Sequence, residues 1–157
     1  MPLPSQMNHI AFSAPGGPEV LHLATALVPE PAAGELLIHV EAAGINRPDI
    51  LQRNGHYPIP PGASPFLGLE VAGEVLAMGR DVTGFKVGDK VCALTNGGGY
   101  ATHAVVPATQ ALPWPKGYDA IRAAALPETF FTVWANLFQM AGLTEGCLLY
   151  TSPSPRD

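Results

Sequence analysis

The chain alternates short apolar stretches with turn-forming residues, and this pattern predicts many short β-strands. Leu36, Ile38 and Val40 are separated by single residues, the period-2 pattern of a half-buried strand. The close spacing of such stretches, with turns between them, indicates an antiparallel barrel or sandwich. The other strands are expected at residues 7–13, 20–23, 67–78, 90–94 and 100–106.

Glycine positions refine this pattern. Gly68 and Gly73 punctuate the apolar stretch 67–78, which predicts a long strand that bends or is closely approached by another backbone. The triplet Gly97–Gly99 invites comparison with a dinucleotide-binding loop, but Thr102 stands where the third glycine of that motif belongs. We therefore interpret the triplet as a hairpin turn.

Helices are expected in three places. Residues 46–53 predict a short helix that tolerates Pro48 in its first turn. Asp119 can cap a helix that runs to Ala125 and ends before Pro127. Thr129 can cap a further helix, which Gly142 ends. One face of that helix carries Phe130, Trp134, Leu137, Phe138 and Ala141.

Composition narrows the class of protein. Gly and Pro contribute 17 residues each, which excludes a helical bundle or coiled coil. Only 13% of residues are charged and the net charge is −5, which argues against a nucleic-acid partner. Two cysteines cannot form a disulfide framework or a four-thiolate zinc site. No signal peptide or membrane-spanning run is visible, so we expect a cytoplasmic protein with no membrane partner.

The most informative motifs lie between residues 43 and 75. The sequence AGINRPDILQRNGHYP at 43–58, followed by LGLEVAGEV at 67–75, resembles the N-terminal catalytic domain of medium-chain dehydrogenases/reductases. Within that superfamily the motifs resemble specifically those of the zinc-free NADPH:quinone oxidoreductases. Supporting motifs are GGPEVL at 16–21, VGDKV at 87–91 and LPE at 126–128. The resemblance covers residues 7 to about 146 and implies a mainly β fold with a few helices, a GroES-like, partly open β-barrel.

The same motifs predict that the protein has no zinc. Zinc-dependent relatives place a Cys where Asn46 stands and a His where Leu69 stands. Catalytic zinc is held by about three protein ligands, and neither side chain supplies a thiolate or an imidazole. Hydride transfer to a quinone does not require the metal, because the nicotinamide carries the chemistry.

The resemblance also implies roles for individual residues. Asn46 is expected beside the nicotinamide, where it contacts cofactor or substrate oxygen, and Thr132 is expected to touch the nicotinamide amide. Tyr57 is expected to stack on a quinone and to donate its hydroxyl proton. Each residue also has a structural alternative. Asn46 can be a turn or helix-cap residue, and the Thr132 hydroxyl can bond to the backbone of its own helix. Tyr57 can simply pack at the rim of the pocket.

Two acidic residues of these motifs also have structural interpretations. Asp49 is a candidate catalytic residue, although a surface ion pair with Arg53, one helical turn away, explains it equally well. Glu70 is the remaining acid of the lost zinc motif and is expected to be structural. Relatives often carry a second tyrosine where Leu51 stands, so this position departs from the family pattern. The five histidines are dispersed and are interpreted as structural residues.

The last residues depart from the family pattern. After residues 143–146 the family continues into an apolar strand and a glycine-rich, phosphate-binding turn, the start of a Rossmann domain. Residues 147–157 read CLLYTSPSPRD instead. Residues 148–152 can be encoded as CTC TTA TAC ACA TCT, which resembles the transposase end of sequencing adapters. We therefore expect a GroES-like catalytic domain at 1–128, a connecting helix at 129–146 and a non-native tail at 147–157.

The functional expectation is a piece of a longer NAD(P)H-dependent quinone oxidoreductase. The intact parent would pass hydride from NADPH or NADH to a quinone or another α,β-unsaturated carbonyl, as a homo-oligomer, whereas the fragment alone would be inactive. A zinc-free enoyl reductase of the same superfamily is one alternative. A non-enzymatic β-barrel binding module is the other.

Overall fold

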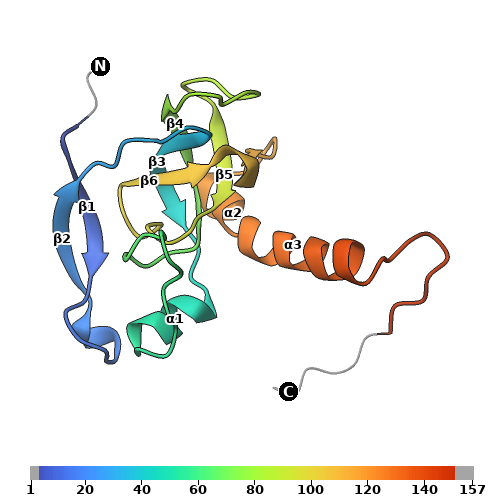
Figure 1. Ribbon diagram of the computed structural model, residues 1–157, viewed down its shortest axis with the longest axis horizontal. Coiled ribbons are helices and arrows are strands. Elements are labelled where there is room, and N and C mark those ends of the chain that lie inside the picture. Colours follow the sequence, from blue (N-terminus) through green and yellow to red (C-terminus); the bar gives the residue numbers. More distant parts are fainter. Residues whose placement is uncertain (1–3, 151–157) are drawn as a thin grey trace.

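The computed structural model describes residues 4–150 and consists mainly of antiparallel β-structure (Figure 1). Strands β1 (Gln6–Ala11) and β2 (His22–Leu27) form a two-stranded sheet. A second sheet has the strand order β6-β3-β4-β5-β7. Its members are β3 (Glu35–Ala43), β4 (Glu70–Met78), β5 (Lys90–Leu94), β6 (His103–Pro107) and β7 (Ala111–Pro113).

The expected mainly β, GroES-like architecture is confirmed, but over residues 4–150 the two sheets do not close into a barrel. They are joined by the isolated bridge between His9 and Ala101. The second strand begins at His22 rather than at Val20, because Pro18–Val20 forms a 3-10 turn, η1. Pro18 at the start of that turn has the fixed φ that favours it.

The five-stranded sheet is covered on both faces. On one face Leu36, Ile38, Val71 and Val75 form the main core and are fully buried. On the other face Ala72 and Cys92 pack against α2 (Ala120–Ala124). The half-buried alternation predicted for residues 36–41 is therefore wrong at its start, because the intervening Leu37 is also buried. A strand covered on both faces gives an apolar run instead of an alternation.

The glycine predictions met different outcomes. A side chain at Gly73 would overlap the backbone of His39 on β3, which confirms the predicted close approach. The hairpin at Gly97–Gly99 is wrong, since β5 and β6 are not neighbours in the sheet. The triplet instead lies beside residues 66–68 and is hydrogen-bonded to them, with Gly99 N donating to Gly68 O at 3.0 Å.

The helices agree with the sequence in place but not always in their caps. Helix α1 covers Arg47–Arg53 with Asn46 as its N-cap. Asp119 caps α2 through a 2.8 Å bond from Arg122 N. The cap predicted at Thr129 is wrong, because α3 (Pro127–Trp134) already begins at Pro127. Proline at the first position of a helix loses no hydrogen bond, since that N–H has no partner inside the helix.

Helix α3 continues into a π-helical segment, η3 (Ala135–Met140), and both extend away from the sheets (Figure 1). The chain leaves the helical conformation before Gly142, whose φ is +63°, as the sequence predicts. Of the segment interpreted as a non-native tail, residues 147–150 are exposed and form neither helix nor strand. Residues 151–157 lie outside the described part of the chain.

His103 on β6 generates a prediction about stability and pH. Its side chain is buried and lies opposite His39 on β3, with 5.5 Å between the ring centroids. Burial, and then the charge of His39, lower the pKa of His103 below its usual 6.5. The unfolded chain therefore takes up a proton at a pH where the folded chain does not. The contribution of His103 to stability is complete above about pH 6.5 and is lost as the pH falls below it.

Unfolding midpoints measured in urea at about pH 7.5 and about pH 5.5 test this expectation. The fall in stability at the lower pH should be smaller in His103→Asn than in the wild type. The control variant is His22→Asn, at an exposed histidine. Its stability should fall between the two pH values by as much as that of the wild type. An equal fall in His103→Asn and the wild type would contradict the assignment.

Candidate functional site

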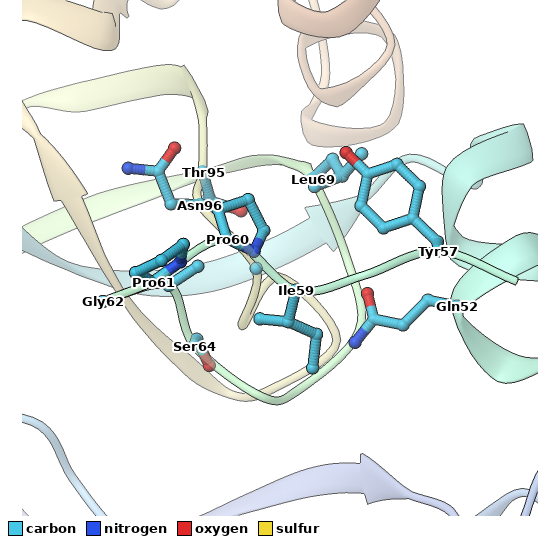
Figure 2. A pocket seen from close by; sticks show the side chains of 12 residues that line it. Gln52, Tyr57, Ile59, Pro60, Pro61, Gly62, Ser64, Leu69, Thr95 and Asn96 are labelled. Atoms are coloured by element: carbon cyan, nitrogen blue, oxygen red, sulfur yellow. The ribbon is translucent and has the colours of Figure 1, made fainter. Parts of the chain in front are cut away.

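A cavity of about 310 Å³ opens to solvent beside helix α1 and is lined by parts of two loops, residues 57–64 and 95–97 (Figure 2). Its walls combine apolar side chains with a few amide and hydroxyl groups, the mixture expected of a small-molecule site. Tyr57 stands at one side with its hydroxyl directed toward Leu69 (Figure 2). The remaining lining residues are Gln52, Ile59, Pro60, Pro61, Gly62, Ala63, Ser64, Thr95, Asn96 and Gly97.

Asn46 lies at the start of α1, where the chain turns from strand β3 into the helix. Its backbone is extended, with φ −122° and ψ 158°, as the N-cap position requires. Its backbone N–H donates to Asp49 Oδ2 at 2.8 Å. Its side-chain Nδ2 donates to Glu70 Oε1 at 2.9 Å, so the half-buried Asn46 is held at both its main chain and its side chain.

Glu70 is the first residue of β4, and its side chain is only 3% exposed. While Oε1 accepts from Asn46, Oε2 accepts from the backbone N–H of Glu128 at 2.9 Å. Glu128 lies in the first turn of α3, and burial, then the nearby charges of Glu70 and Asp49, raise its pKa. One buried carboxylate therefore joins the N-terminus of α1 to that of α3.

Asp49 is buried, with 4% of its surface exposed, and its carboxylate accepts three hydrogen bonds. Besides Asn46 N, the donors are Gly68 N at 3.1 Å and the Tyr100 hydroxyl at 2.9 Å. The alternative of a surface ion pair is wrong, because Asp49 is inaccessible and Arg53 Nε donates to the carbonyl of Gly16 at 3.0 Å. The catalytic role of Asp49 stays a prediction.

Gly68 is the point at which three segments meet. Its φ of +101° is a conformation that favours glycine, and a Cβ there would lie 2.5 Å from the backbone nitrogen of Tyr100. Its carbonyl accepts from Thr95 Oγ1 at 2.8 Å, while its N–H donates to Asp49. Gly68 thus ties α1 to Thr95, directly after β5, and to residues 99–100, which lie before β6.

The structure brings together only some of the residues predicted for the site. Asn46, Asp49 and Glu70 form one bonded cluster, whereas Tyr57 lines the adjacent cavity. Thr132 is exposed on α3 and lies outside the lining of the cavity. Sequence reasoning missed Tyr100, whose hydroxyl reaches Asp49 across 51 residues, and burial followed by the charge of Asp49 raises its pKa.

Two further features bear on metals and membranes. Among residues 4–150, no three His, Cys, Asp or Glu side chains are grouped so that they could hold a metal ion. No helix in that range has the length and apolar character needed to cross a membrane.

Replacing Asp49 with Asn tests whether its carboxylate organises the site. Asparagine keeps one acceptor oxygen, so a donor such as Gly68 N would face an NH₂ group. We expect the free energy of unfolding to fall by about 2–3 kcal/mol, the cost of a buried donor left without a partner. Urea unfolding of the 157-residue chain measures the change.

The matched control is Asp119→Asn, at an exposed carboxylate that caps α2. Asparagine caps helices as well as aspartate does, so this change should stay within about 0.5 kcal/mol. Equal effects of the two substitutions would show that the Asp49 carboxylate does not hold the site together.

Comparison with known proteins gives consistent relatives. The human "Synaptic vesicle membrane protein VAT-1 homolog-like" is 35% identical over 141 residues, which are 90% of this chain and 34% of that protein. Its crystal structure superposes with a TM-score of 0.79 over 90% of this chain and 46% of that chain. A "Quinone oxidoreductase" from Pseudomonas aeruginosa is 42% identical over 120 residues, which are 76% of this chain and 37% of the relative.

A solved mycobacterial protein, Rv1454c in complex with NADPH, is 33% identical, with a TM-score of 0.74 over 89% of this chain and 42% of that chain. The chain thus spans about a third of the length of these curated relatives and less than half of these solved structures. Residues 32–116, more than half of the chain, match the alcohol dehydrogenase GroES-like domain. The chain therefore belongs to the GroES-like domain family of alcohol dehydrogenases, within the medium-chain dehydrogenase/reductase superfamily.

Proposed function

We propose that the chain forms the substrate-binding half of a zinc-independent NAD(P)H:quinone oxidoreductase. The observation that carries this proposal is the chemistry of the two positions where zinc-dependent relatives place a Cys and a His. Asn46 is hydrogen-bonded to Glu70, and Leu69 lines the cavity. Neither side chain offers a thiolate or an imidazole, so the site is built for orientation and hydrogen bonding.

The residues at α1 fit a nicotinamide. The bond from Asn46 Nδ2 to Glu70 leaves the carbonyl oxygen, Oδ1, as the acceptor of Asn46. Oδ1 takes part in the capping box with the backbone of Asp49, and its second lone pair can accept from a carboxamide NH₂. Thr132, exposed on α3, is a second residue proposed to contact the nicotinamide amide. When bound, NADPH or NADH supplies the hydride. The relative solved with NADPH supports a nicotinamide cofactor for the parent enzyme.

The cavity fits a flat, conjugated carbonyl compound. Its volume of about 310 Å³ lies at the small end of ligand pockets. Tyr57 offers an aromatic face and a hydroxyl, while Ile59 and Pro60 form an apolar wall. We propose that Tyr57 stacks on the substrate ring and donates a proton to the reduced oxygen. The quinone oxidoreductase among the relatives supports this substrate class.

Asp49 enters this proposal through Asn46. Its oxygens already accept three hydrogen bonds, one of them from the main chain of Asn46. The catalytic contribution that we propose for Asp49 is therefore to hold the backbone at which the Asn46 side chain begins.

We also propose a division of the chain into a GroES-like catalytic domain at 1–128, a connecting helix at 129–146 and a non-native tail at 147–157. The parent enzyme is proposed to be cytoplasmic and homo-oligomeric, with a Rossmann domain that supplies most of the cofactor contacts. The partial coverage of the relatives, 37% of the Pseudomonas aeruginosa quinone oxidoreductase and 42% of the protein solved with NADPH, supports a longer parent enzyme.

The parent enzyme, expressed from its complete coding sequence, tests the proposed substrate class. We expect NADPH oxidation with duroquinone and little with an enoyl thioester. Tyr57→Phe should lower kcat by about 10²-fold, because it removes the proton donor but keeps the ring. Tyr118→Phe, at an exposed tyrosine outside the cavity, should leave the rate unchanged.

Other results would favour the alternatives. Faster reduction of the enoyl thioester would assign the parent to the enoyl reductases. Absence of NADPH oxidation with either compound would favour a binding module without catalysis. A parent enzyme that loses its activity to a zinc chelator would contradict zinc independence.

The 157-residue chain itself is expected to catalyse no NADPH-dependent quinone reduction, because most of the cofactor contacts are proposed to lie in the Rossmann domain. It should still bind duroquinone in the cavity. Nuclear magnetic resonance (NMR) titration is expected to shift the signals of Tyr57 and Ile59 and to leave those of Tyr118 in place. Quinone reduction by this chain at the rate of the parent enzyme would overturn the proposed division of labour.

A further inference from the structure

The Glu70 carboxylate joins the two elements that carry the proposed cofactor contacts. Oε1 accepts from the side chain of Asn46, and Oε2 accepts from the first turn of α3, the helix that carries Thr132. We propose that Glu70 is a positioning residue, which sets the orientation of the Asn46 amide and ties it to the start of α3. The inference deepens the proposed function and rests on it for the role of Asn46.

The bond to Glu70 decides which end of the amide faces the site. An ionised carboxylate can only accept hydrogen bonds, so Asn46 must turn its NH₂ group toward Glu70. The carbonyl oxygen then points away from Glu70. The capping box places that oxygen against the backbone of Asp49, while Asp49 accepts from the main chain of Asn46, so Glu70 and Asp49 favour the same orientation of the amide.

Glu70 is itself fixed by the sheet. Its backbone pairs with Leu94 of β5, and its carbonyl accepts from Gly44 N at 3.1 Å. Side chains alternate along a strand, so Glu70 shares a face with Ala72, which packs against α2. The sheet therefore directs the carboxylate toward the helices and away from the main core.

Gly44 provides the space for this carboxylate. A Cβ at Gly44 would overlap the carboxyl group of Glu70, whereas the backbone of Gly44 has no conformation that requires glycine. The fit of a glycine against the carboxyl group is a second observation, independent of the hydrogen bonds. It shows that the Glu70 carboxyl group packs directly against the main chain of Gly44.

Substituting Glu70 with Gln gives a specific expectation, because glutamine has one acceptor oxygen where glutamate has two. The backbone N–H of Glu128 cannot turn, so the glutamine oxygen should stay with it. The glutamine NH₂ then faces Asn46, and the Asn46 amide should flip to accept from it. The flip would present a donor to the site in place of an acceptor.

NMR spectroscopy of the 157-residue chain can observe this flip without any cofactor. In Glu70→Gln the side-chain NH₂ signals of Asn46 should shift upfield and exchange faster with water, while the N–H signal of Glu128 stays in place. Glu74→Gln is the matched control, on the same strand and the same face, and its carboxylate pairs with Lys90 at 3.4 Å. It should leave the Asn46 signals unchanged.

The double variant Asn46→Asp/Glu70→Gln rebuilds the pair with donor and acceptor exchanged. It should be more stable than Glu70→Gln alone. This difference in stability tests the proposal even if the single variant is unfolded, because the double variant should then fold. Unchanged Asn46 signals in a folded Glu70→Gln variant would overturn the proposal. So would a double variant that is no more stable than the single one.

The same substitutions in the parent enzyme separate this inference from the proposed function. Glu70→Gln should lower kcat by about tenfold or more, because small misplacements of a binding group cost on the order of 10²-fold. The KM for duroquinone should stay constant, since Glu70 does not line the cavity. A confirmed flip with unchanged kcat would leave the hydrogen-bond geometry correct and count against the proposed role of Asn46.

Discussion

The buried carboxylate of Asp49 is the constraint on which the candidate site depends. Its three donors come from the start of α1, from Gly68 and from Tyr100, which are distant in the sequence. A carboxylate this inaccessible is tolerated only when hydrogen bonds replace its lost hydration. The three segments must therefore assemble together, and two of them carry residues that line the cavity, Gln52 on α1 and Leu69 beside Gly68.

The alternation of side chains along β4 adds a second constraint. Val71 and Val75 face the main core, so Glu70 faces the helices. A shift of one residue in the pairing of β4 would place a carboxylate in the core. The packing that stabilises the sheet and the orientation of the Asn46 amide thus depend on the same register, with Glu70 opposite Leu94.

Much of this arrangement could be predicted from the sequence, because strands, turns and helix caps are local features. The cap at Asp119, the helix after Asn46 and the close approach at Gly73 all depend on neighbouring residues or on the absence of a side chain. The contact between Tyr100 and Asp49 could not be predicted, because it spans 51 residues and no local pattern marks it. The Gly97–Gly99 triplet misleads for the same reason, since its partner is the distant segment 66–68.

The proposed absence of zinc changes what acidic residues do at such a site. A metal would orient its ligands by coordination and would polarise the substrate directly. Without a metal, orientation would have to come from hydrogen bonds, and an asparagine amide could face the proposed nicotinamide with either its donor or its acceptor. A single buried acceptor removes this ambiguity, because it admits only one of the two orientations. In the proposed zinc-independent site, Glu70 would provide through acceptor geometry the order that coordination provides in zinc-dependent relatives, while Asp49 holds the main chain of Asn46.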